Sequence, residues 1–272
     1  MFRKFKKISL FFIVLSLWGQ DVQAAFEPRP LGAWQRALGN AGLASVYSGF
    51  AAYNNPALLA GKGGPALSLL YQNFFGLADL NQIALSVSAP LYGLDLGLDV
   101  LRLGNTTYSE TTFSAAAAMR LTPSLVLGVG VNSYLLEIKN YGRDVAFGLQ
   151  LALRYQLSEG LEMAVVAANV NEPVIGRARE ALPVFGRAGM LWRPVEQVTL
   201  FADALYEQEW DAFFGLSYRL NDHLRLMTGT QSLNNSFSAG FLLSLDNIRL
   251  GYALEVHPEL NYSHTVDIRY EF

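Results

Sequence analysis

From residue 65 onward, short segments of the chain alternate between apolar side chains and small or polar ones. The segment 248–256 shows this most clearly, because its apolar parity consists of Ile248, Leu250, Tyr252, Leu254 and Val256. Its other parity carries Arg249 and Glu255. A period of two is typical of a β-strand, in which successive side chains point to opposite faces. The pattern therefore predicts an all-β structure of short antiparallel strands.

A soluble β-sandwich and a transmembrane barrel both alternate in this way, and a sandwich places its charged residues outside. Here the apolar parity is continuous from segment to segment and almost free of charge, as a lipid-facing surface must be. An arginine in the middle of that face would cost roughly 2–4 kcal/mol. Aromatic residues also gather near the segment ends, as in the interfacial girdle of a barrel: Tyr92, Tyr155, Trp192, Tyr206, Tyr218 and Tyr270.

The segments add up to about fourteen strands, an even number as in single-chain bacterial barrels. The expected strands are 66–74, 82–89, 93–103, 107–121, 124–138, 144–157, 161–170, 184–193, 197–206, 212–220, 223–230, 236–245, 247–256 and 263–272. Tight turns alternate with connections that tend to be longer, of which 171–183 is the longest. Short turns belong to the periplasmic side of such barrels and longer loops to the outside.

Charged residues fall on the polar parity, which would line the lumen. The expected lumen-lining charges are Asp95, Asp99, Arg120, Arg154, Asp203, Arg219, Arg249, Glu255, Asp267 and Arg269. Several arginines precede the proposed periplasmic turns, and two interpretations of them stay open. In the first, the arginines form a basic ring at the periplasmic opening of the barrel; in the second, they pair with lumenal carboxylates such as Glu162.

The first residues indicate the compartment. Four basic residues between positions 3 and 7 precede an apolar run at 8–18 and a small-residue cleavage site at 22–24. The run is about 11 residues long, whereas a spanning helix needs roughly 20, so residues 1–24 are predicted to be a signal peptide. A signal peptide before a barrel predicts the bacterial outer membrane, with its lipid as the surrounding partner. The chain contains no cysteine, which excludes a lipoprotein anchor, disulfides and thiolate metal sites.

The composition argues against an enzyme and against a nucleic-acid-binding protein. A formal net charge of −3 with 16% charged residues provides no basic footprint for a nucleic acid. The three histidines, His223, His257 and His264, lack the spacing of a metal site. We therefore expect no catalytic residues, no metal and no cofactor.

Between the signal peptide and the first strand lies 25–64, which is rich in Gly, Ala and Asn and has no strong period. Its most specific signals are the run at 36–44 (RALGNAGLA) and the motif Asn55-Pro56-Ala57. This combination resembles the N-terminal region of the FadL-like outer-membrane transporters and of the related PorV and PorQ proteins. The resemblance implies that 25–64 enters the barrel 65–272 as a plug, with Asn55, Pro56 and Ala57 at a gate inside the lumen.

The chain ends in Tyr270-Glu271-Phe272, and its apolar residues at alternate positions resemble the signal read by the barrel assembly machinery. Tyr270 and Phe272 would carry that signal.

The resemblance to FadL implies passive transport of small hydrophobic molecules through a plugged barrel. The resemblance to PorV implies the alternative, an accessory barrel of a protein secretion system that binds a secretion partner. The chain departs from the transporters in having one sizeable loop, 171–183, where they carry large outer loops.

Overall fold

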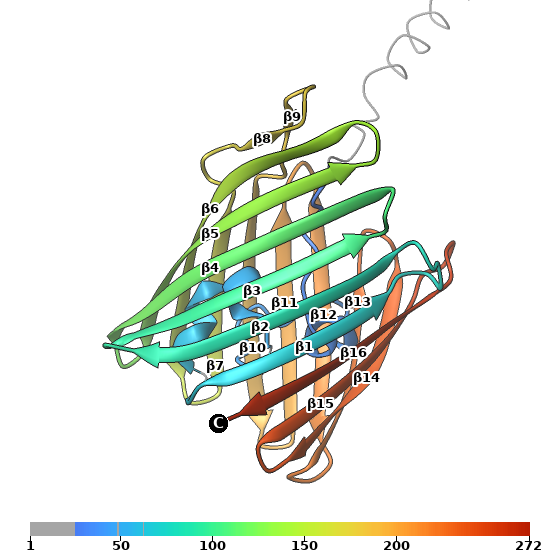
Figure 1. The fold of residues 1–272 in the computed structure, drawn as a ribbon. Helices are drawn as coiled ribbons and strands as arrows, with labels where there is room; N and C mark the ends of the chain where they lie inside the picture. Colours follow the sequence, from blue (N-terminus) through green and yellow to red (C-terminus); the bar gives the residue numbers. More distant parts are fainter. Residues whose placement is uncertain (1–24, 48, 62) are drawn as a thin grey trace, which may run out of the picture.

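Fourteen strands close into one antiparallel barrel in the computed structural model, which describes residues 25–47, 49–61 and 63–272 (Figure 1). The barrel strands are β1 (Ala66–Asn73), β2 (Asn81–Leu91), β3 (Leu94–Gly104), β4 (Tyr108–Thr122), β5 (Leu125–Ile138), β6 (Gly142–Ser158), β7 (Leu161–Ala168), β10 (Phe185–Val195), β11 (Val198–Tyr206), β12 (Trp210–Arg219), β13 (Leu224–Gln231), β14 (Ser236–Leu245), β15 (Ile248–Val256) and β16 (Tyr262–Glu271). The predicted class and strand number are confirmed. The predicted signal peptide lies outside the described residues.

The barrel closes where the first strand meets the last. Leu67 in β1 pairs with Tyr270 in β16 and, on its other side, with Val87 in β2. Strands that follow one another in sequence pair with each other throughout, except in the connection from β7 to β10. That connection contains a small hairpin of its own, β8 (Val174–Ile175) and β9 (Glu180–Ala181), which the sequence did not predict.

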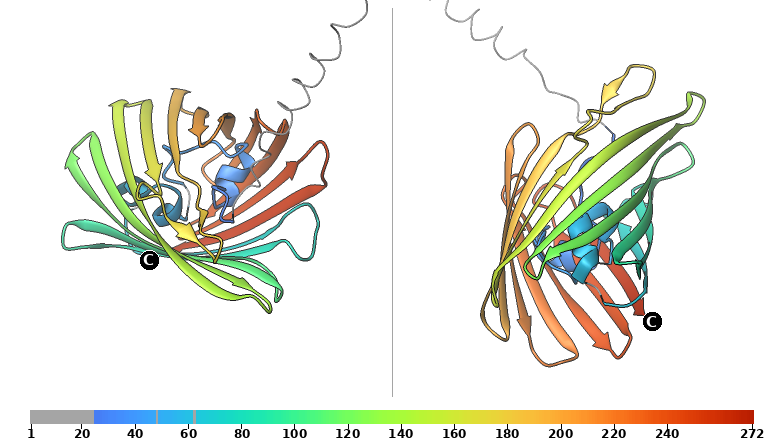
Figure 2. Two further views of the ribbon diagram at one scale, coloured as in Figure 1. Left: turned by 90° about the horizontal axis from the view of Figure 1, so that it is seen from above. Right: turned by 90° about the vertical axis from the view of Figure 1, so that its left-hand side faces the viewer.

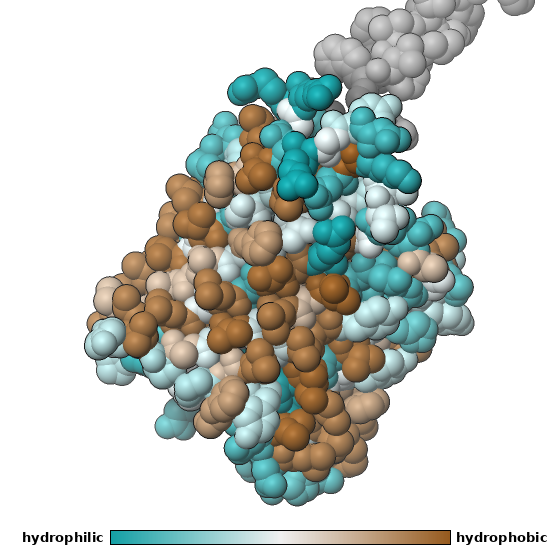
Figure 3. All heavy atoms as spheres, in the orientation of Figure 1, coloured by the Kyte–Doolittle hydropathy of each residue, from teal (hydrophilic) through white to brown (hydrophobic). Residues whose placement is uncertain are grey.

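Alternating side chains divide the wall into an apolar outside and a mixed inside. Ile83, Leu98 and Phe147 expose 56%, 61% and 61% of their surface, whereas Ser86 and Asp99 on the inward parity expose 3% and 1%. Figure 3 shows a broad hydrophobic area over the middle of the barrel and hydrophilic residues gathered toward the end that carries β8 and β9. So large an apolar surface is unstable in water and fits the hydrocarbon of a bilayer. No helix among the described residues is long and apolar enough to cross a membrane.

A small charged group interrupts the outer parity at the long-loop end. Arg102 lies opposite Ile83 on the outside of the wall, and its guanidinium is 3.3 Å from the carboxylate of Glu137. Arg143 lies 3.8 Å from the same carboxylate. Charge is tolerated close to the membrane interface and not at its centre, so this group marks one limit of the lipid-facing surface.

Residues 25–64, apart from the undescribed 48 and 62, form the inner segment, which lies within the ring of strands (Figure 2). It contains three short helices, α2 (Ala33–Ala37), α3 (Ala51–Asn54) and η1 (Pro56–Gly61). Leu31, Leu38, Phe50 and Leu58 are fully buried. Helices of one turn are unstable alone, so packing against the wall holds them. The helix α2 packs on β13–β16, and η1 packs on β3–β6.

Inward-facing glycines make room for the inner segment. A Cβ atom at Gly215 would lie 2.9 Å from the Cβ of Leu38, and one at Gly97 would lie 2.6 Å from a methyl carbon of Leu59. Real Cβ atoms do not approach neighbours so closely without movement, so a larger residue at Gly215 would displace the segment, whereas one at Gly97 would mainly require the end of the Leu59 side chain to turn away. Of the glycines that the alternation places inside, Gly148 differs, because it faces Asn169 and Tyr134 and not the inner segment.

Candidate functional site

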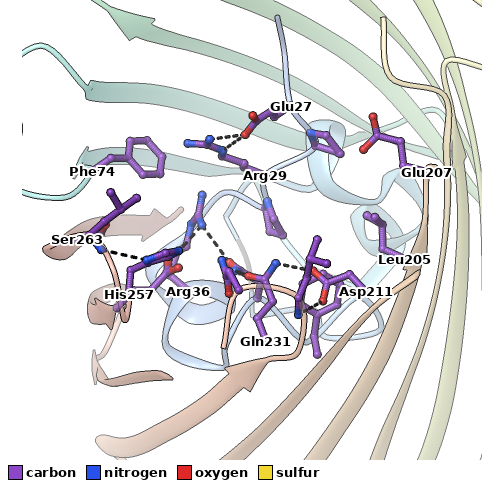
Figure 4. A pocket seen from close by; sticks show the side chains of 18 of the residues that line it. Glu27, Arg29, Arg36, Phe74, Leu205, Glu207, Asp211, Gln231, His257 and Ser263 are labelled. Atoms are coloured by element: carbon purple, nitrogen blue, oxygen red, sulfur yellow. Dashed lines mark hydrogen bonds and ion pairs between the residues drawn. The ribbon is translucent and has the colours of Figure 1, made fainter. Parts of the chain in front are cut away.

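A cavity with a volume of about 420 Å³ lies at the long-loop end of the barrel. We call it the vestibule. Its walls come from connections at that end, including Phe74, Glu207, Leu233 and His257, and its floor comes from the inner segment (Figure 4). Two smaller cavities, of about 210 and 40 Å³, share Arg29 with it. The stretch 26–30 therefore crosses the mouth and divides the space there into three compartments.

A chain of hydrogen bonds crosses the vestibule floor. The Nη1 of Arg36 in α2 donates to Asn40 Oδ1 at 3.1 Å and to Glu255 Oε2 of β15 at 3.5 Å. Asn40 Nδ2 donates to Gln231 Oε1 of β13 at 2.9 Å, and Gln231 Nε2 donates to Asp211 of β12. The network joins the inner segment to both sides of the cavity, and Figure 4 shows Arg36, Gln231 and Asp211 at its floor.

Phe74 brings the two vestibule arginines together. The guanidinium carbon of Arg29 lies 5.0 Å from the centroid of its ring, and that of Arg36 lies 5.3 Å from it. Arg29 also donates through Nε to Glu27 Oε2 at 2.8 Å. Cations over an aromatic face are attracted by its quadrupole, so Phe74 supports both arginines while their carboxylate partners neutralise them.

Carboxylates outnumber guanidinium groups in the vestibule. Glu27 and Glu255 pair with Arg29 and Arg36, whereas Glu207, Glu209 and Asp211 have no lysine, arginine or histidine partner within ion-pair distance in the described part of the chain. Burial raises the pKa of Glu207, and the nearby charge of Glu27 raises it further. The vestibule is therefore an acidic space, although part of its lining is apolar.

Three aspartates of the wall hold backbone amides of the inner segment. Asp267 Oδ2 in β16 accepts the amide of Ala33 at 2.6 Å, and Asp203 Oδ2 in β11 accepts the amide of Leu43 at 2.9 Å. Asp99 Oδ2 in β3 accepts the amide of Tyr53 at 2.8 Å. Arg187, which the sequence did not single out, donates to Asp203 at 2.7 Å. The three contacts are spread around the barrel and attach the segment at three points along its length.

The remaining predicted lumenal charges gather near the short-turn end, on the inward parity. Arg154 forms an ion pair with Glu162 at 2.7 Å, and Arg249 forms one with Glu271 at 3.3 Å. Arg269 also forms an ion pair with Glu271, and Arg219 forms one with Glu196. Arg120 donates a hydrogen bond to the backbone carbonyl of Ala60. Asp95 lies within electrostatic reach of Arg120. Carboxylates pair with Arg154, Arg219, Arg249 and Arg269, as the second interpretation expects, and a basic ring at this mouth stays a prediction.

One part of this arginine group has an aromatic partner. The guanidinium carbons of Arg225 and Arg249 lie 4.9 and 5.6 Å from the ring centroid of Tyr47 in the inner segment. Arg225 and Arg249 therefore reach the inner segment through the ring of Tyr47, as Arg29 and Arg36 meet on Phe74 at the other end.

Asn55, Pro56 and Ala57 do not line any of the described cavities. Asn55 is fully buried; its Nδ2 donates to the carbonyl of Leu43 at 2.8 Å, and its Oδ1 accepts the amide of Ala57 at 3.0 Å. Pro56 Cγ would lie 3.3 Å from a Cβ atom at Gly130 in β5. The motif thus fixes the internal shape of the segment. Its role as a gate stays a prediction.

Tyr270 and Phe272 lie at the seam where the barrel closes. Their rings meet edge to face with centroids 4.8 Å apart, and the amide of Phe272 donates to the carbonyl of Pro65 at 2.9 Å. Phe272 remains 73% exposed. Recognition by the assembly machinery stays a prediction.

The vestibule residues Arg29 and Glu207 were not singled out from the sequence, and Arg36 was noted only as the first residue of the run at 36–44. Arg29 and Arg36 lie in the stretch without a period, where no face can be assigned. Glu207 could have been found, because it lies in the connection between the expected strands 197–206 and 212–220, where a carboxylate would face the outer opening of the barrel. The described residues contain no group of three or more side chains able to hold a metal ion.

The closed antiparallel barrel of fourteen strands defines the class of protein as a transmembrane β-barrel, and three solved channels share its fold. The toluene transporter TbuX of Ralstonia pickettii superposes with a TM-score of 0.67 at 14% identity, covering 91% of this chain and 100% of its own. The monoaromatic hydrocarbon channel CymD gives 0.66 at 13% identity, covering 91% and 99%. The toluene transporter TodX of Pseudomonas putida gives 0.61 at 16%, covering 89% and 98%.

At these identities the likeness concerns the fold. The FadL-like part of the sequence resemblance is confirmed at that level, and the resemblance to PorV and PorQ stays a prediction. No family model and no curated protein matches the chain.

Proposed function

We propose that this chain is a bacterial outer-membrane channel that admits small, mainly apolar molecules from the long-loop side. The position of the vestibule is the observation on which this proposal depends most. Cavity space of useful size lies at one end, and below it most of the described residues between 31 and 60 of the inner segment are buried against the wall. A solute would bind in the vestibule first and pass only when the inner segment shifts, so binding rather than pore size would set selectivity.

The likeness to hydrocarbon channels supports this proposal, because the three solved channels are described as carriers of toluene or monoaromatic hydrocarbons. The apolar part of the vestibule supports it as well, since Phe74, Phe75, Phe213 and Leu233 line the cavity. The inner segment would act as the plug, and a signal peptide would deliver the chain to the outer membrane.

Uptake into vesicles tests the proposal. Apolar solutes cross a phospholipid bilayer unaided, so the vesicles need lipopolysaccharide in their outer leaflet as a barrier. Vesicles with the purified barrel should accumulate radiolabelled toluene faster than vesicles with a heat-denatured sample. Equal rates over a panel of single-ring solutes would end the proposal. Co-purification with a large partner barrel, without any uptake, would support the secretion-accessory alternative instead.

A further inference from the structure

The vestibule is more polar than a plain hydrocarbon requires. Phe74, Leu205, Phe213 and Leu233 give it apolar sides, whereas its floor is the hydrogen-bonded network around Arg36. A hydrocarbon filling this space would remove solvent from the floor and offer no hydrogen bond in return. The lining fits a ligand with an apolar body and one polar group. Its volume of about 420 Å³ suits a molecule of one or two rings.

Arg36 offers unused donors to that polar group. Its side chain is 5% exposed and it lines the vestibule. Its Nη1 bonds to Asn40 and Glu255, whereas Nε and Nη2 have no hydrogen-bond partner among the described residues and are closed off from solvent, so a ligand oxygen reaches them only when the side chains above them move aside. A guanidinium carries only donors and stays charged, so a buried one needs acceptors. A ligand oxygen at the floor would supply one.

The surrounding charges decide which oxygen fits. An ammonium group has no acceptor for Arg36. A carboxylate would accept, but it would face Glu27, Glu207, Asp211 and Glu255 across the same cavity, and like charges at short range repel strongly. A hydroxyl group accepts from the guanidinium and donates to a carboxylate at once. A hydroxyl thus satisfies both partners without adding charge.

We propose that the vestibule selects uncharged molecules with an apolar body and a hydroxyl group, and that Arg36 recognises the hydroxyl. This inference rests on the proposed function, because it names the class of solute that the same site would capture. The buried Arg36 and the carboxylates around it are the features by which the vestibule would prefer such molecules over plain hydrocarbons.

Four probes of nearly equal size test the inference: toluene, benzyl alcohol, benzylammonium and benzoate. The full chain is labelled with ¹⁵N and studied in detergent micelles, where the Nε–H signal of Arg36 reports directly on the floor. The variant Arg36→Lys identifies that signal by its loss. Benzyl alcohol should shift the signal to saturation and bind about tenfold more tightly than the other probes, as expected for one charge-assisted hydrogen bond.

The wild-type comparison needs no variant, so it stands even if a change at Arg36 impairs folding. A folded Arg36→Gln protein should bind benzyl alcohol and toluene within about twofold of each other. Arg102→Gln, which removes an arginine from the outer surface, should leave the preference unchanged.

Equal binding of toluene and benzyl alcohol by the wild-type chain, or tightest binding of either ion, would overturn the inference and leave the proposed function intact. Binding of the alcohol that leaves the Arg36 signal unmoved would also overturn it. If none of the probes binds and vesicle uptake is absent too, the proposed function fails with it. If none binds although toluene is taken up, only the inference fails.

Discussion

The carboxylate of Asp267 in the last strand accepts the backbone amide of Ala33, the first residue of α2, at 2.6 Å. The two residues are 234 positions apart. A carboxylate at the start of a helix satisfies an amide that has no partner within the helix. The contact therefore attaches one end of the inner segment to the seam of the barrel.

Loss of this attachment should loosen the segment. Asp267→Ala removes the acceptor, and a hydrogen bond to a charged group contributes about 1.5–3 kcal/mol, so we expect a lower unfolding temperature in detergent and a raised ion leak in planar bilayers. Asp267→Asn keeps one acceptor oxygen and should give a smaller effect on both. An unchanged leak in a folded Asp267→Ala protein would show that this contact does not hold the segment.

A disulfide should lock the inner segment to the wall. A Cβ atom at Gly97 in β3 would lie 3.2 Å from the Cβ of Ala52 in α3, near the 3.5–4.5 Å that a disulfide needs. The natural chain has no cysteine, so the pair Ala52→Cys and Gly97→Cys can form only one bond. Oxidised protein should lose solute uptake, and reduction should restore it.

The matched control for the lock is a bond within the wall. Ala117 in β4 and Val129 in β5 pair across adjacent strands, and both lie on the outward parity, away from the inner segment. The pair Ala117→Cys and Val129→Cys should leave uptake unchanged in either redox state. Full uptake by the oxidised Ala52 and Gly97 pair would mean that solutes pass without movement of α3.

Close packing between glycine and the inner segment should be sensitive to one methyl group. Gly215→Ala would place a carbon 2.9 Å from the Cβ and from the carbonyl oxygen of Leu38, so we expect a loss of about 1–3 kcal/mol in stability. Gly186→Ala is the control, because a Cβ atom there would meet nothing within 4 Å. Thermal unfolding followed by gel mobility or circular dichroism separates the two.

Stability should fall with rising pH through the titration of Glu207. Burial, and secondarily the charge of Glu27, raise the pKa of this loop carboxyl in the folded state above its ordinary value. The folded state then binds more protons than the unfolded state between the two pKa values, so its stability decreases as pH rises through that window. Glu207→Gln should reduce the difference in unfolding temperature between pH 4.5 and pH 8.

An exposed loop carboxylate provides the comparison for that measurement. Glu259→Gln should leave the pH dependence unchanged, because Glu259 lies in the exposed connection between β15 and β16. A dependence that persists unaltered in Glu207→Gln would assign the effect to another group.

Strand positions followed closely from the alternation, because one buried face fixes both register and ends. The predicted strand 236–245 coincides with β14. The predicted strand at 212–220 begins instead at Trp210, since Trp210 pairs with Tyr206 across a tight connection. The one-turn helices of the inner segment and the two-residue strands β8 and β9 escaped prediction, because they are too short to leave a period and depend on tertiary contacts.

The site could be predicted only in part. The inward position of Asp99, Asp203 and Asp267 follows from strand parity, but their amide partners lie 46, 160 and 234 residues away in a segment without a pattern. The meeting of Arg29 and Arg36 on Phe74 is equally a product of the closed fold. The position of a residue in the strand alternation predicts which face of the wall it lies on. Its hydrogen-bond partner depends on how distant segments of the chain are arranged in the folded protein.

The inner segment touches both halves of the wall, with α2 on the last strands and η1 on the first ones. Because it precedes every strand in the chain, it can be in place before the edge strands β1 and β16 meet. A barrel closed beforehand could receive the inner segment only through one of its two ends, past the narrow glycine-lined interior. We therefore expect the strands to close around the inner segment, which is synthesised first. A barrel that lacks the inner segment should not be restored when the segment is added later as a separate peptide.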